Sequence, residues 1–202
     1  LNIINEEDMK VPIIISKSLK SINTFIDEVY KRMKKGGRLF YIGSGTPGRL
    51  GIVDASECPP TFGVSNNVII GIIAGGDKAL RNSIEGAEDQ SDNAVSDLKA
   101  YSLNKLDTVI GISCSGAASY VVSALSYARE LKAKTVYLVT NPNPFKTTDV
   151  DVIITANTGP EIITGSTRMK AGTATKLILN MISTTTMIKL GKVYGNLMVD
   201  VK

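Results

Sequence analysis

Histidine and tryptophan are absent from the 202 residues of the chain, and cysteine occurs only twice, at Cys58 and Cys114. Without histidine, the chain cannot build a Ser-His-Asp triad, a Cys-His dyad or a histidine-bearing zinc site. Two cysteines are too few for a disulfide scaffold or a thiolate metal cage, so we expect reduced thiols and neither a metal nor another cofactor. The candidates for chemistry are therefore carboxylates, hydroxyls and backbone N–H groups.

Long apolar runs and a signal peptide are also missing. No stretch reaches the roughly 18 to 20 apolar residues of a membrane span, and residues 1–8 are acidic rather than basic and then apolar. The chain does not begin with Met, so it can be a piece of a longer protein. The densest basic run, residues 31–35, has no interleaved aromatic residues, which favours a solvated helix end over a nucleic-acid patch. We expect a cytoplasmic protein with no membrane or nucleic-acid partner.

The order of the predicted elements indicates an α/β fold. The hydrophobic content of 43% suffices for one large core, so residues 1–202 are expected to form a single domain. Strands and helices alternate, which predicts a parallel five-stranded sheet with helices on both faces, a three-layer α/β/α arrangement. The predicted strands are 38–42, 68–74, 107–112, 135–140 and 151–155. An N-terminal helical segment is predicted over residues 1–37, with its helix at 11–35. After the first strand we expect a short helical stretch that ends at Glu57, before two prolines. The remaining predicted helices are 79–87, 92–100, one that follows residue 119, and a long helix at 166–191.

Two turns rich in small and hydroxyl-bearing residues follow strands one and three, at residues 43–48 and 113–119. Ligands of parallel sheets bind at the carboxyl ends of the strands, near the point where the strand order reverses. Backbone N–H groups and hydroxyls in such turns suit a phosphate. We therefore expect the two turns to converge on a phosphate, with the carboxylate of Glu57 nearby.

Each of these motifs has an alternative interpretation. Gly43, Gly45 and Gly48 also fit the spacing of a dinucleotide turn, but Asp77 lies too far along the chain to hold a ribose. Glu57 is either functional or a solvated carboxylate at a helix end. Glu85 and Glu88 lie three residues apart and are expected to share a helical face, either as a solvated acidic end or with one of the two in a pocket.

The last predicted helix carries two further expectations. Ser166 and Lys170 stand at its start and suggest an anion site, with simple capping by Ser166 or Thr167 as the alternative. The helix is apolar nearly all round, which favours a homodimer interface over plain core packing.

Longer blocks of sequence carry a resemblance to a known family. The chain resembles the N-acetylmuramic acid 6-phosphate etherases of the sugar-isomerase (SIS) group, and more distantly the glucokinase regulatory proteins. The resemblance spans nearly the whole chain and rests on residues 48–51, 54–61, 73–76, 85–89, 159–161, 164–174 and 191–200.

The resemblance implies an SIS fold and cleavage of the D-lactyl ether at C3 of a muramic acid 6-phosphate, giving N-acetylglucosamine 6-phosphate and lactate in cell-wall sugar recycling. It places the two family glutamates on Glu57, which handles the lactate oxygen, and Glu88, which acts at C2. The phosphate is then expected on Ser44, Thr46 and Ser115, with Gly45 and Gly116 allowing close backbone approach.

The chain departs from the family pattern in both turns. Pro47 stands where the family has serine, and Ala117-Ala118 replace an arginine and a threonine, so Ser113 or Ser119 is the candidate replacement ligand. These changes keep two alternatives open: a sugar-phosphate sensor that resembles the glucokinase regulatory proteins, and an SIS isomerase that interconverts ketose and aldose phosphates.

Overall fold

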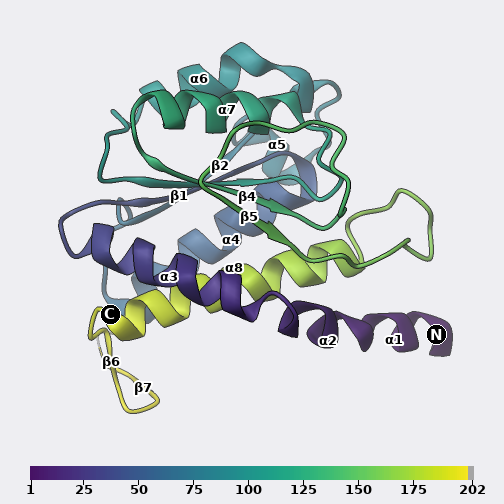
Figure 1. Ribbon diagram of the computed structural model, residues 1–202, viewed down its shortest axis with the longest axis horizontal. Coiled ribbons are helices and arrows are strands. Elements are labelled where there is room, and N and C mark those ends of the chain that lie inside the picture. Colours follow the sequence, from purple (N-terminus) through teal and green to yellow (C-terminus); the bar gives the residue numbers. More distant parts are fainter. Residues whose placement is uncertain (200–202) are drawn as a thin grey trace.

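A parallel sheet of five strands forms the centre of the computed structural model, which describes residues 1–199 (Figure 1). Its strand order is β2-β1-β3-β4-β5, as the alternating sequence pattern predicts. The strands are β1 (Leu39–Gly43), β2 (Ile69–Ile73), β3 (Thr108–Ile112), β4 (Lys134–Val139) and β5 (Val152–Thr155). The order reverses between β1 and β3, so their carboxyl ends are neighbours, with Gly43 opposite Ile112.

Successive strand residues point to opposite faces of the sheet, and both faces are covered. Leu39 and Tyr41 of β1 face one hydrophobic cluster, whereas Phe40 and Ile42 face the other. Helices α6 (Ser91–Lys99) and α7 (Ser119–Glu130) cover the second face, and α3 (Leu19–Met33), α4 (Gly45–Phe62) and α8 (Lys170–Lys189) cover the first (Figure 1). The expected three-layer arrangement is confirmed.

The N-terminal segment forms three helices rather than the single helix expected at 11–35. Helix α1 (Asn2–Asp8), which lies within the expected helical segment 1–37, is followed by α2 (Lys10–Ser16) and α3. The break falls at Lys17 and Ser18, where the Ser18 hydroxyl donates a hydrogen bond of 2.8 Å to the carbonyl of Thr155. This contact with the end of β5 redirects the chain.

Two further helix boundaries differ from the prediction. Helix α4 continues through Pro59 and Pro60 and ends at Gly63, which has the left-handed φ of +63°, so Glu57 lies inside the helix and not at its end. The helix expected at 79–87 is reduced to α5 (Lys78–Arg81), followed by an irregular loop and the short 3-10 helix η1 (Ala87–Asp89). Arg49 causes this change, because its guanidinium donates to the carbonyls of Leu80 and Asn82.

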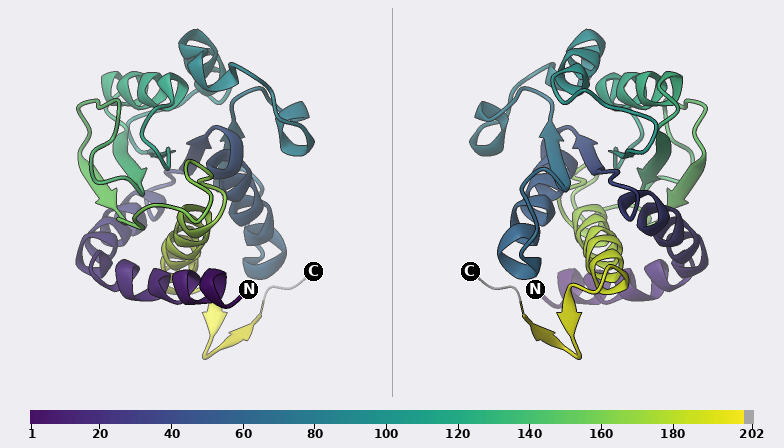
Figure 2. Two further views of the ribbon diagram at one scale, coloured as in Figure 1. Left: turned by 90° about the vertical axis from the view of Figure 1, so that its right-hand side faces the viewer. Right: turned by 90° about the vertical axis from the view of Figure 1, so that its left-hand side faces the viewer.

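Helix α8 is buried within its own chain. Its inward residues, among them Ile178 and Ile182, pack in the same cluster as α3 and α4. This corresponds to the core-packing alternative, so the apolar character of α8 is explained without a second subunit. After α8, strands β6 (Val193–Tyr194) and β7 (Leu197–Met198) form a hairpin that projects from the helical layer (Figure 2). In the described part of the chain, no helix is both long and apolar enough to cross a membrane.

Candidate active site

The turn after β1 leads directly into α4 and leaves backbone donors free. Ser44 is the N-cap of α4, and its hydroxyl makes no capping hydrogen bond. The N–H groups of Gly45 and Thr46 begin the helix and have no acceptor within it. Pro47 lies in the first helical turn, where a proline is tolerated, although it removes a third donor. The turn therefore offers the donors and the positive end of a helix dipole that an anion prefers.

A cavity of about 250 Å³ opens beside this turn. Ser44, Gly45 and Arg49 line one side of it, and Glu85 and Glu88 line the other. Glu88 is exposed and belongs to η1. Glu85 belongs to the preceding irregular loop, so the two glutamates do not share a helical face, and both border the cavity where one was expected. The cavity thus combines a potential phosphate anchor with carboxylates on the opposite wall.

The second turn, residues 113–119, lies beside the first because it follows β3. A side chain at Gly116 is excluded, since a Cβ there would come within 2.2 Å of the Cβ of Pro144, and its φ is +76°. The Ser115 hydroxyl accepts a hydrogen bond of 3.3 Å from the Ala117 N–H. Ser119 is the first residue of α7, which has no side-chain N-cap bond. This turn, too, presents free helix N–H groups.

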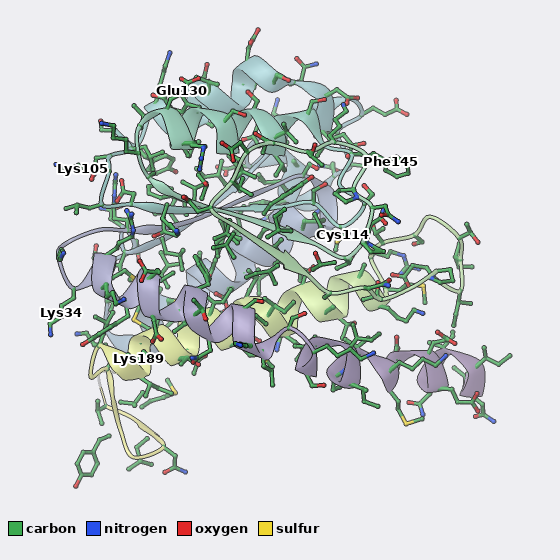
Figure 3. The ribbon with its side chains drawn as sticks, in the orientation of Figure 1. Lys34, Lys105, Cys114, Glu130, Phe145 and Lys189 are labelled. Atoms are coloured by element: carbon green, nitrogen blue, oxygen red, sulfur yellow. The ribbon has the colours of Figure 1, made fainter. Side chains whose placement is uncertain are left out.

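Ser115 also borders a second cavity, of about 360 Å³, at the ends of β3, β4 and β5. Cys114, Thr140 and Glu161 are among its other lining residues. Cys114 lies in the interior at this edge of the sheet (Figure 3), and burial raises the pKa of its thiol. Burial also raises the pKa of Cys58, to about 12. Both thiols are free and buried, and neither is poised as a nucleophile.

Glu57 does not join Glu88 within one chain. It is exposed on α4, 12 residues beyond Gly45, which at 1.5 Å per residue is about 18 Å along the helix. It lines neither cavity described above. Exposed neighbours on the same side of α4 include Val53, at 54% exposure, and Pro60. Thus the structure brings Ser44, Gly45 and Glu88 together and leaves Glu57 on a separate surface.

The start of α8 is occupied by protein groups. The helix begins at Lys170, four residues after the expected start, and neither Ser166 nor Thr167 caps it. Instead, the carboxylate of Glu161 accepts hydrogen bonds from the N–H groups of Lys170 and Ala171. The Lys170 ammonium is 2.6 Å from the carboxylate of Glu7. The donors of this expected anion site are therefore engaged.

A metal would find few ligands. Among residues 1–199, no group of three or more Cys, Asp and Glu side chains is placed to hold a metal ion.

Comparison with known proteins places this geometry in a family. Residues 21–129 match the glucokinase regulatory protein N-terminal SIS domain. N-acetylmuramic acid 6-phosphate etherases are similar over nearly the whole chain: that of Caldanaerobacter subterraneus is 59% identical over 98% of the chain, and that of Exiguobacterium sp. is 56% identical over 100% of the chain and 69% of its own length. The chain belongs to the N-acetylmuramic acid 6-phosphate etherase family. It spans 65% of the length of the Caldanaerobacter etherase and 66% of that from Mycoplasma mycoides, which is 58% identical over 99% of the chain.

Solved structures with low sequence identity share the fold of this etherase-family chain. A phosphoheptose isomerase from Francisella tularensis superposes with a TM-score of 0.68 at 16% identity, covering 93% of this chain and 96% of its own. The Vibrio vulnificus NanR protein complexed with ManNAc-6P gives a TM-score of 0.65 at 13% identity, covering 95% and 63%.

One candidate residue of the etherase-family site was missed by sequence reasoning. Lys146, in the loop after β4, donates a hydrogen bond from its ammonium to the Ser119 hydroxyl. The sequence held no signal for it, because the contact joins residues 27 positions apart and depends on how the loop folds back.

Proposed function

We propose that the chain carries the catalytic SIS domain of an N-acetylmuramic acid 6-phosphate etherase, a carbon–oxygen lyase of cell-wall sugar recycling. The observation that carries the proposal is the cavity in which Glu88 faces the turn of Ser44 and Gly45. The names of relatives at 48% to 59% identity support the enzyme over a regulatory protein or an isomerase. We also propose a cytoplasmic location, because the two buried cysteines form no disulfide, as is usual in a reducing compartment.

The 6-phosphate is proposed to bind across the two turns. Ser44, Thr46 and Ser115 would supply hydroxyls, and the free N–H groups at the starts of α4 and α7 would supply backbone donors and dipoles. Anchoring the phosphate at the ends of β1 and β3 places the sugar over the cavity lined by Glu88. Because Ser166 and Lys170 lie at the occupied start of α8, the proposal does not depend on them.

The elimination of lactate then needs two proton transfers. In the open-chain sugar the C2 proton lies α to the aldehyde, and Glu88 removes it while lactate leaves from C3. A second carboxylic acid, assigned to Glu57, protonates the departing ether oxygen. Water then adds across the C2–C3 double bond of the unsaturated aldehyde, with its hydroxyl going to C3 and a proton returning to C2. Each positioned acid or base contributes about 10² to 10⁴ in rate.

The separation of the two glutamates supports a homodimer whose site is shared. Because Glu57 and Glu88 are not brought together in one chain, we propose that Glu57 of the partner subunit reaches the cavity. Val53 and Pro60 beside Glu57 give that surface the partly apolar character of an interface.

Incubation of the protein with N-acetylmuramic acid 6-phosphate and measurement of D-lactate tests this function. The expected result is lactate release, reduced at least about 100-fold by Glu88→Gln and by Glu57→Gln. Glu130→Gln is the matched control, because Glu130 is an exposed helix residue at the far end of α7. Absence of lactate from folded protein would contradict the proposal.

A further inference from the structure

The second phosphate turn has no positive charge of its own. Residues 113–119 contain no lysine or arginine, and the first turn of α7 contains none either. Beside the first turn, the guanidinium of Arg49 donates from Nε to the Leu80 carbonyl and from Nη2 to the Asn82 carbonyl. A phosphate dianion bound at the second turn would therefore find no cation within residues 113–119 themselves.

Lys146 brings a cation to this place from another loop. Its ammonium donates to the hydroxyl of Ser119 and lies 3.9 Å from the carboxylate of Asp89. The side chain is 45% exposed and that of Asp89 is 66% exposed, so the contact between them is weak and open to solvent. An incoming phosphate can replace the Asp89 carboxylate as the partner of the ammonium.

The backbone of the loop holds Lys146 in position. Its N–H donates a hydrogen bond of 2.7 Å to the Gly116 carbonyl, and its own carbonyl accepts one of 3.3 Å from the Tyr137 hydroxyl. The neighbouring Pro144 packs so closely on Gly116 that no side chain fits between them. Phe145, in contrast, is 78% exposed and points away from the molecule (Figure 3). These contacts hold the loop against the second turn, so that the ammonium of Lys146 lies beside the Ser119 hydroxyl.

We propose that Lys146 is the cationic ligand of the substrate phosphate, acting together with Ser119. This inference rests on the proposed function, since it takes the two turns as the phosphate site. A phosphate oxygen beside Ser119 accepts from the ammonium as well as from the hydroxyl, and such charge-assisted hydrogen bonds are stronger than neutral ones. The chain thereby places a positive charge at a turn made only of small, hydroxyl and aliphatic residues.

Steady-state kinetics of Lys146→Ala test the assignment. Since the phosphate is remote from the reacting carbons, the expected result is a KM for N-acetylmuramic acid 6-phosphate raised about 10- to 100-fold, as for loss of a hydrogen bond to a charged group, with kcat changed much less. Competitive inhibition by inorganic phosphate should weaken by a similar factor, and Lys146→Arg should restore most of both. Lys105→Ala, at an exposed lysine on the opposite side of the molecule, is the matched control (Figure 3).

Two outcomes would overturn the assignment. The first is a KM in Lys146→Ala equal to that of the wild type. The second is a lower kcat and a lower melting temperature in Lys146→Ala with no change in inhibition by inorganic phosphate, because this combination would indicate a structural role for Lys146.

Binding of N-acetylglucosamine 6-phosphate, measured by calorimetry, separates this inference from the proposed reaction. If the wild-type protein releases no lactate yet binds this sugar phosphate, and Lys146→Ala weakens the binding, the reaction is wrong and the role of Lys146 stands. If both proteins release lactate with equal KM, the reaction stands and the role of Lys146 is wrong.

Discussion

The carboxylate of Glu161 closes the N-terminus of α8 by accepting the N–H of Lys170 at 3.1 Å, and it also accepts the N–H of Ala171 at 2.9 Å. Glu161 is itself buried, at 9% exposure. It takes the position that a bound anion would take at a free helix end. The loop of residues 156–169, which connects β5 with α8, is therefore fixed by its own side chain.

Glu161→Ala should destabilise the fold, because it leaves two N–H groups unsatisfied and removes a negative charge from the helix N-terminus. Loss of an N-cap costs about 0.5 to 2 kcal/mol, and we expect the upper end of that range because the site is buried. Urea unfolding measures the change. Glu130→Ala serves as the control on an exposed helix end, and an equal effect of the two variants would contradict the capping role.

The ion pairs of Glu7 predict a pH dependence. Hydrogen bonds from Lys10 and then from Lys170 lower the pKa of Glu7 from 4.5 to about 2. A carboxyl with a lowered pKa contributes stability that is present above its unfolded pKa and is lost as the pH falls toward its folded pKa. Glu7→Gln should therefore lower the melting temperature at neutral pH, and the gap from wild type should close between about pH 4.5 and 2.

Glu6→Gln, in the same helix, is the control for the pH series, because Glu6 is exposed. A gap between wild type and Glu7→Gln that stays constant down to pH 2 would show that the ion pairs do not support α1.

Asp54 joins β1, α4 and α8 through two buried contacts and one partly buried contact. It accepts hydrogen bonds from the Tyr41 hydroxyl at 2.9 Å, the Asn180 amide at 2.6 Å and the Ser183 hydroxyl at 3.0 Å. An unsatisfied buried donor costs about 1 to 3 kcal/mol, so Asp54→Ala should destabilise the protein by about 3 kcal/mol or more. Tyr41→Phe removes a single donor and should cost about 1 kcal/mol.

Chemical denaturation distinguishes the two Asp54 network variants. The exposed Ser56, which bonds only the carbonyl of Val53 one turn earlier, provides the control as Ser56→Ala. Equal stability of Asp54→Ala and Ser56→Ala would mean that the network does not hold the helices to the sheet.

The sheet could be predicted from the sequence because its strands are buried on both faces and therefore read as continuous apolar runs. Helix boundaries were harder to predict from the sequence where contacts with distant residues determine them. Arg49 donates to the carbonyls of Leu80 and Asn82 at the end of α5, and Ser18 breaks the N-terminal helix by reaching β5. Pro59 and Pro60 suggested an end to α4, yet the helix runs through them to the left-handed Gly63.

The residues of the candidate site likewise fall into those that local sequence patterns reveal and those that depend on distant contacts. Gly43, Gly45 and the serines of both turns could be found from local spacing, since they follow strands directly. The contact of Lys146 with Ser119 and the capping by Glu161 arise from loops that fold back, which local patterns do not encode. The placement of Glu57 and Glu88 on separate surfaces likewise required the fold.

Lactate release by a mixed dimer tests the shared site most directly. Glu57→Ala and Glu88→Ala proteins are each expected to be inactive alone. If each site combines Glu88 of one subunit with Glu57 of the partner subunit, a heterodimer of the two variants contains one intact site. Exchange of equal amounts should then restore about a quarter of the wild-type rate, since half of the dimers are mixed and each has one of two sites. A mixture that forms heterodimers yet releases no lactate would contradict the account.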